Sequence, residues 1–445
     1  MMGSTKRPGE GTPTEEKTPP LGTPALQPGE PRSGLARRTT PPSGLRKNLA
    51  GGLSSPPSGA PRTPPPSAPK TNASNPPSAP RGASKTIPPS APRAISPSGP
   101  PSSFPPPGPA SPKLDFGLMT PAARVVEELL SVRPTDRVVI VHDEANADVA
   151  VAFEHATAER GALVERLAWG REEHRPLPAC PRDVISAIRG ATATVLAVSL
   201  EEGEYDARYG LINGVVSART RHVHMVGSGR RAFIGSMMAS TGRVFELLQA
   251  LRSSMRPASR LSVRSPAGTQ LEIEMAPHLR WFANGHAVVP AQWINVPFGA
   301  LISSPATVSG TYVVDASIGG GMGARAGLLD SRPIRLSIEG GRVRRVDCTD
   351  LALKRYVESF MAEAPGRDRI GMLSLGANLG IREPLGEIVH DENMPGLHLS
   401  LGDTVPARTG ATWTAYGQLA FAGCHADVDL DGEPLIRRAR YVRFV

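Results

Sequence analysis

Between residues 120 and 256, short β-branched runs alternate with segments whose apolar residues recur at helical spacing. The predicted strands are 137–143, 162–169, 192–200 and 221–227. The predicted helices are 120–132, 147–161, 181–190, 205–219 and 243–254, the first with Thr120 as its N-cap. Strands that alternate with helices form βαβ units and a parallel sheet. Residues 114–256 are therefore predicted to be a Rossmann-like α/β domain.

From about residue 258 the apolar residues follow period two, which is typical of antiparallel strands. One helix is predicted at 351–364, and the Gly-rich segment 317–327 is predicted to be a flexible connection with no helix after it. The predicted fold class is thus α/β plus β-rich. A Rossmann-like domain packs on a mostly antiparallel β domain at 257–445, with the functional site in the cleft between them.

Residues 1–113 differ from the rest of the chain in composition. They hold 30 of the 47 prolines, with 14 Lys+Arg against 4 Asp+Glu, so their charge of about +10 accounts for the net +9. Such a segment cannot bury enough apolar surface to offset its chain entropy, and it is predicted to be a disordered basic tail. This tail could contact anionic surfaces or proline-binding modules. It could equally be a linker without a partner.

The cysteines and the hydropathy pattern indicate a cytoplasmic protein. Cys180, Cys348 and Cys424 are widely spaced, which fits neither a disulfide framework nor a CxxC zinc site. No run of 18 apolar residues and no secretory signal is present in the sequence. The first strand-to-helix junction lacks the glycines of a dinucleotide site, and no specific nucleic-acid motif is found. A homodimer is left open.

Within the stretch 420–435, polar residues occur at every second position and would share one face of a strand. His425, Asp427, Asp429 and Asp431 alternate with apolar residues, so a strand would place His425 and Asp427 side by side. One interpretation is a half-exposed edge strand running into an Asp431-Gly432 hairpin turn. The other is a metal site. The triplet of His390, Asp391 and Glu392 is interpreted as a solvated turn from which an acid could act as a base.

Four segments keep a common order along the second domain: 264–275, 295–305, 372–403 and 424–436. Together they resemble the aminopeptidase T / aminopeptidase S type of metallo-aminopeptidase, over essentially all of 114–445. The resemblance implies a β-rich domain whose metal ions activate a water for peptide hydrolysis. It places metal ligands at His398, His425 and Asp427. Two carboxylate ligands and one tyrosine of that family are replaced here by Ala300, Met372 and Val405.

Three functions follow as alternatives. The first is a hydrolase that removes N-terminal residues from small peptides, with one divalent metal ion (Zn, Co or Fe(II)) on the three retained ligands. The second is a mononuclear iron dioxygenase that cleaves the ring of a small aromatic diol, because two histidines and one carboxylate are the ligand set of such enzymes. The 2,5-dihydroxypyridine dioxygenases are distantly similar, although their upstream histidine matches Met372. The third is a non-catalytic scaffold.

Overall fold

The computed structural model describes residues 115–444 except 172–173 and 256–259, all within one compact unit. The predicted basic tail, 1–113, lies outside the described residues, and so does the predicted domain boundary between 256 and 257. Both stay predictions. Within the described part of the chain, no helix is long and apolar enough to cross a membrane.

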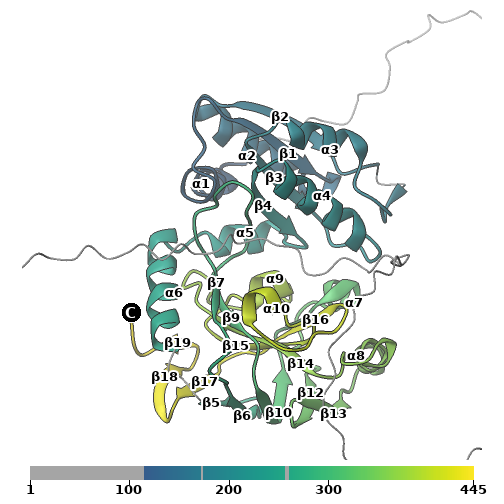
Figure 1. The fold of residues 1–445 in the computed structure, drawn as a ribbon, viewed down its shortest axis with the longest axis vertical. Helices are drawn as coiled ribbons and strands as arrows, with labels where there is room; N and C mark the ends of the chain where they lie inside the picture. The colour runs from purple at the N-terminus through teal and green to yellow at the C-terminus, as the bar shows by residue number, and fades with distance from the viewer. Residues whose placement is uncertain (1–114, 172–173, 256–259, 445) are drawn as a thin grey trace, which may run out of the picture. The chain divides into compact units, whose positions relative to one another are not determined.

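The first part of the described chain contains a five-stranded parallel sheet of order β2-β1-β3-β4-β8 (Figure 1). Its strands are β1 (Arg137–His142), β2 (Leu163–Ala168), β3 (Ala193–Val198), β4 (Arg221–Val226) and β8 (Trp293–Asn295). The first four are the predicted strands, and their parallel pairing confirms the α/β prediction. The fifth comes from beyond residue 257 and pairs with β4.

Helices cover both faces of this sheet. They are α1 (Phe116–Arg124), η1 (Val125–Leu129), η2 (Glu144–Asn146), α2 (Ala147–Glu159), α3 (Arg182–Arg189), α4 (Tyr205–Ser217), α5 (Arg230–Ser236) and α6 (Thr241–Met255). One face packs in the core formed with α1, α2 and α6, and the opposite face packs against α3 and α4. Strands with two covered faces are predominantly apolar, as the all-buried β3 is, and the hydroxyl of its one polar residue, Thr194, is hydrogen-bonded to His222.

The predicted start of the first helix at Thr120 is wrong. The helix α1 begins at Phe116, because the side chain of Asp115 accepts a hydrogen bond from the Gly117 N–H at 2.8 Å and so caps it. Pro121 consequently lies inside the helix rather than at its first position.

The second part contains two antiparallel sheets, which confirms the predicted β-rich region. The eight-stranded sheet has the order β13-β12-β10-β6-β5-β17-β18-β19. Its strands are β5 (Arg260–Arg264), β6 (Gln270–Glu274), β10 (Thr307–Val314), β12 (Ile334–Glu339), β13 (Arg342–Asp347), β17 (Asp427–Leu430), β18 (Glu433–Arg437) and β19 (Arg440–Tyr441). The predicted helix at 351–364 is α8 (Leu351–Glu363).

The six-stranded sheet has the order β11-β16-β15-β14-β9-β7. Its strands are β7 (Phe282–Asn284), β9 (Ala300–Ser303), β11 (Ser317–Ile318), β14 (Ile370–Gly376), β15 (Gly396–Gly402) and β16 (Gln418–Ala422). The short helices α7 (Gly320–Ala326), α9 (Ile388–Asp391) and α10 (Pro406–Thr409) lie near it (Figure 1). The helix α7 lies within the Gly-rich segment 317–327, so the prediction that this segment is a flexible connection is wrong.

Candidate functional site

The six-stranded sheet has one apolar face and one face that lines a cavity. Along β15, Leu397, Leu399 and Leu401 belong to the hydrophobic core. The residues between them, His398 and Ser400, therefore lie on the other face, because successive strand residues alternate. The register places Ser374 of β14 beside His398, and Met372 of β14 and Ala420 of β16 beside Ser400.

The cavity over this face has a volume of about 180 Å³. At about 30 Å³ per water it has room for about six water molecules, and therefore for a small ligand. Side chains from β7, β8, β9, β14, β15 and β16 line it, together with residues that follow α9 and β15. The lining includes Asn284, His286, Asn295, Ala300, Met372, Ser374, Glu392, His398, Ser400, Arg408 and Gln418.

His398 is buried in the cavity wall, not solvent-facing as its isolated sequence context suggested. It is 2% exposed, and its Nε2 lies 2.9 Å from the carbonyl oxygen of Met394. A carbonyl only accepts, so Nε2 carries the proton and Nδ1 keeps a free lone pair. Nδ1 is buried without a partner. Burial lowers the pKa of this imidazole, so it is neutral.

The close approach of Met394 to β14 depends on a glycine. A Cβ on Gly376 would lie 1.9 Å from the Met394 carbonyl oxygen, so any other residue would displace the carbonyl that holds His398. Two further polar atoms of the lining, Ser400 Oγ and His286 Nε2, are also buried without a partner. Buried polar groups are nearly always hydrogen-bonded. Three such atoms in one cavity therefore provide hydrogen-bonding capacity for water or a polar ligand.

Glu392 follows α9 and lines the same cavity. Burial, and then the neighbouring Asp391 carboxylate, raise its pKa from 4.5 to about 7. The predicted solvated turn is therefore wrong, because His390 and Asp391 are 2% and 0% exposed. Asp391 has a structural role: its two oxygens accept hydrogen bonds from the backbone N–H groups of Leu385 and Gly386.

The raised pKa of Glu392 predicts a pH dependence of stability. Between pH 4.5 and about 7 the folded state keeps a proton on Glu392 that the unfolded state has lost, so stability falls as pH rises. The loss is about 1.4 kcal/mol per pH unit, or about 3 kcal/mol in total. Glutamine does not titrate. We expect the Glu392→Gln chain to gain about 3 kcal/mol relative to wild type between pH 5 and pH 8 in urea denaturation. Parallel stability curves would contradict the raised pKa of this carboxyl.

The predicted strand across 418–430 is interrupted in the structure. β16 ends at Ala422 in the six-stranded sheet, and β17 begins at Asp427 in the eight-stranded sheet. His425 lies between them, exposed and with a φ of 52°, so it does not sit beside Asp427 on a strand. The predicted Asp431-Gly432 hairpin is confirmed: both residues have positive φ, 49° and 87°, and join β17 to β18.

The three predicted metal ligands lie in different parts of the fold. His398 lines the cavity, whereas His425 and Asp427 do not. The Asp427 carboxylate accepts a hydrogen bond from the Arg438 backbone N–H at 2.6 Å. Among the described residues, no group of three or more His, Cys, Asp or Glu side chains is arranged to hold a metal ion. The donors present therefore do not fit the divalent metal that the resemblance implies.

Two of the three positions of the lost ligands nevertheless lie at the cavity, whereas Val405 precedes α10 and does not line it. Ala300 and Met372, which replace the two carboxylates, line it together with His398. Ala300 is paired with Gly376 of β14, and Ser374 of β14 is paired with His398 of β15, so all lie on three adjacent strands. The cavity thus occupies the place where the resemblance puts the site, with a different set of polar groups.

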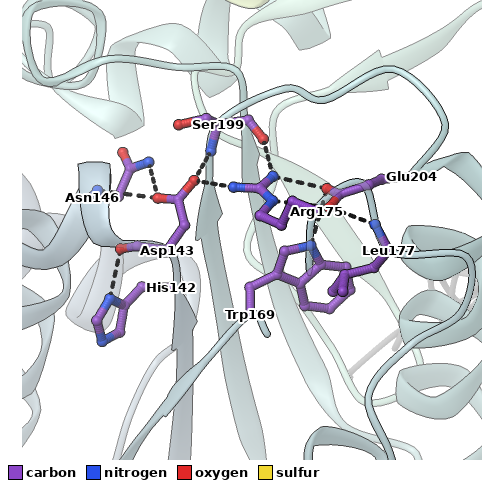
Figure 2. Close-up of polar contacts among 8 residues, drawn as sticks. All are labelled: His142, Asp143, Asn146, Trp169, Arg175, Leu177, Ser199 and Glu204. Carbon is purple, nitrogen blue, oxygen red and sulfur yellow. Dashed lines mark hydrogen bonds and ion pairs between the residues drawn. The ribbon is translucent and has the colours of Figure 1, made fainter. Parts of the chain in front are cut away.

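A second polar cluster lies at the carboxyl ends of the parallel strands (Figure 2). Asp143 follows β1, Ser199 follows β3 and Glu204 precedes α4. The Arg175 guanidinium forms ion pairs with Asp143 at 2.7 Å and Glu204 at 2.8 Å, and the three side chains are 5%, 1% and 0% exposed. Arg175 also donates to the Ser199 carbonyl at 3.0 Å.

Each charged group of this cluster has hydrogen-bonding and ionic partners. Burial alone would raise the pKa of Asp143, but hydrogen bonds from Asn146, Ser199 and Arg175 hold it below its ordinary value. Arg175 has its pKa raised, chiefly by the hydrogen bond to Glu204. In sheets of this strand order, ligands bind at the switch point between β1 and β3. Here the protein's own Arg175 occupies that position, so we interpret the cluster as structural.

Comparison with known proteins shows what fold this is. No protein-family model matches the chain, and no curated protein matches it significantly. The structure of 2,5-dihydroxypyridine dioxygenase from Pseudomonas putida matches 73% of this chain and 97% of its own, with a TM-score of 0.54 and 18% identity. Wild-type AmpT from Thermus thermophilus matches 73% of this chain and 99% of its own, with a TM-score of 0.56 and 16% identity. The chain therefore shares a fold with both, at a distant level of relationship.

Proposed function

We propose that this chain is a hydrolase that removes N-terminal residues from short peptides, and that the reaction takes place in the cavity over the six-stranded sheet. The observation that carries the proposal is that one cavity is lined both by a carboxyl with a pKa of about 7 and by a buried neutral imidazole with a free Nδ1. Perturbed titratable groups in a cavity are typical of catalytic sites. The shared fold with AmpT, an aminopeptidase T, supports the hydrolase class.

In this proposal Glu392 is the general base and then the general acid. Its carboxylate takes a proton from a water whose oxygen bonds to the peptide carbonyl carbon. The C–N bond then breaks, and the same proton passes to the leaving nitrogen, which regenerates the carboxylate. A carboxyl with a pKa near the working pH suits both steps.

His398 positions the water. Its Nε2–H is held by the Met394 carbonyl, which fixes the ring, so the Nδ1 lone pair can accept a hydrogen bond from the attacking water. Asn284, Asn295 and Ser374 line the cavity and supply donors for the negative charge that develops on the carbonyl oxygen. No step in this scheme uses a metal ion, because the donors of the described residues do not fit one.

A second candidate is non-catalytic binding of the same ligand. Its support is the loss of both carboxylates, at Ala300 and Met372, in the cavity wall. The ring-cleaving dioxygenase is not favoured, because its iron needs two histidines and a carboxylate together, and the described part of the chain has no such group.

The three cysteines are free thiols, which supports the predicted cytoplasmic location.

The test is the release of free amino acids from a panel of peptides of two to six residues, quantified by mass spectrometry. The protein is assayed after dialysis against a chelator and again with added Zn²⁺. We expect release from the short peptides in both conditions. Saturable binding without release would support the non-catalytic candidate. Release that requires the metal would restore the predicted metal-dependent reaction.

A further inference from the structure

The cavity wall contains a cation, Arg408, in the short helix α10. Its guanidinium carbon lies 3.7 Å from the centroid of the Phe282 ring, so the group is stacked and fixed in direction. Stacking on an aromatic face orients the donor fork of an arginine but supplies no negative charge. The charge of Arg408 therefore needs another partner.

No described residue supplies that partner. No carboxylate of the described residues pairs with Arg408, and its Nε is buried without a hydrogen-bond acceptor. Burial lowers its pKa to about 10 and is the only cause of the shift, so no described acid stabilises its charge. At neutral pH the group stays protonated. A half-buried cation without a counter-charge is unfavourable, and a bound anion would relieve it.

Arg408 and the proposed catalytic groups lie at different ends of the cavity. Phe282 is paired with Ile302, Ile302 with Ser374, and Ser374 with His398, so Phe282 and His398 are three strands apart in one row. Three strand spacings are about 14 Å. Because both side chains extend into the cavity, the space between them is shorter and suits two or three residues at about 3.5 Å each.

We propose that Arg408 binds the C-terminal carboxylate of the ligand, so that the site selects dipeptides and tripeptides with a free carboxylate. The guanidinium fork matches a carboxylate in a bidentate manner. The selection concerns binding and stands by itself, whereas the hydrolysis of these peptides rests on the proposed function. Peptides whose C-terminus is amidated lack the anion and are disfavoured.

The experiment compares L-alanyl-L-alanine with its C-terminal amide by titration calorimetry. Both are titrated into the Glu392→Gln chain, which prevents turnover. We expect the free acid to bind about 10- to 100-fold more tightly than the amide. Adding Arg408→Gln should abolish the difference, whereas adding Arg344→Gln, an exposed arginine of β13, should leave it unchanged.

A thermal melt separates ligand binding from a structural role. Arg408→Gln removes an uncompensated charge, so its melting temperature should equal or exceed that of its parent chain. The inference would be overturned if Arg408→Gln lowered the melting temperature and reduced the affinity for acid and amide equally. The stacking of Arg408 on Phe282 would then be its only role. Absence of binding by either ligand would overturn the inference as well.

Amino-acid release by the chain with Glu392 intact distinguishes this inference from the proposed function. A preference for the free acid that depends on Arg408, without any release, would uphold the inference and contradict hydrolysis. Equal release from acid and amide, unchanged by Arg408→Gln, would uphold hydrolysis and contradict the inference.

Discussion

Replacing Glu392 by glutamine is expected to lower kcat for dipeptide hydrolysis by about 10²- to 10⁴-fold and to change KM little. Glutamine has nearly the same shape, so the cavity of about 180 Å³ is retained. It cannot take a proton from water, however, and so the attacking nucleophile is not generated. Steady-state kinetics on L-alanyl-L-alanine measure both constants.

Glu339→Gln provides the matched control for this prediction. Glu339 ends β12 far from the cavity lining, and its side chain is 81% exposed, so the same chemical change should leave kcat within about twofold. A decrease of less than about threefold in the Glu392 variant would remove this carboxyl from the reaction. An equal decrease in both variants would point to a general effect of the lost charge.

Replacing Arg175 by methionine is expected to destabilise the fold by about 3–5 kcal/mol. Methionine retains much of the aliphatic volume, but Asp143 and Glu204 are left as buried carboxylates without their cation. Five of the hydrogen bonds around these carboxylates come from other groups, all of them uncharged, and do not neutralise them. Urea denaturation at pH 7 gives the change in unfolding free energy.

Arg137→Met is the control for this second substitution. Arg137 forms an ion pair with Glu165 at 2.7 Å, but the two side chains are 47% and 40% exposed. Exposed pairs contribute about 0–1 kcal/mol, so the control should change stability by less than about 1 kcal/mol. Equal losses of unfolding free energy in the two variants would show that the loss at Arg175 does not come from the burial of its ion pairs.

The fold class could be predicted because hydrophobic periodicity reports local structure. The four predicted strands of the parallel sheet and the two-residue period after 258 depend only on which faces are buried. The interruption between β16 and β17 could not be predicted in this way. The alternation continues through Cys424 and Ala426, yet the chain passes from one sheet to the other there, with His425 at a φ of 52°. The missed helix α7 is Gly-rich and has low intrinsic propensity, so its tertiary context must favour it.

The candidate site could be predicted only in part. The resemblance drew attention to His398, Ala300 and Met372, and all three line the cavity. Glu392 was interpreted only as an acid of a solvated turn, and Arg408 was missed. They belong to loops and a short helix rather than to a periodic element, and no fixed spacing relates them to Phe282 or His398. Their roles depend on burial, which the sequence alone does not report.

The proposed hydrolysis and the proposed carboxylate site both require that the peptide bind in the cavity over the six-stranded sheet. A crystal structure of the Glu392→Gln chain with L-alanyl-L-alanine tests this requirement. We expect the dipeptide to lie in this cavity, with its carboxylate on the Arg408 guanidinium and its peptide carbonyl towards residue 392 and His398. A dipeptide bound elsewhere on the chain, or an empty cavity at saturating dipeptide, would contradict it.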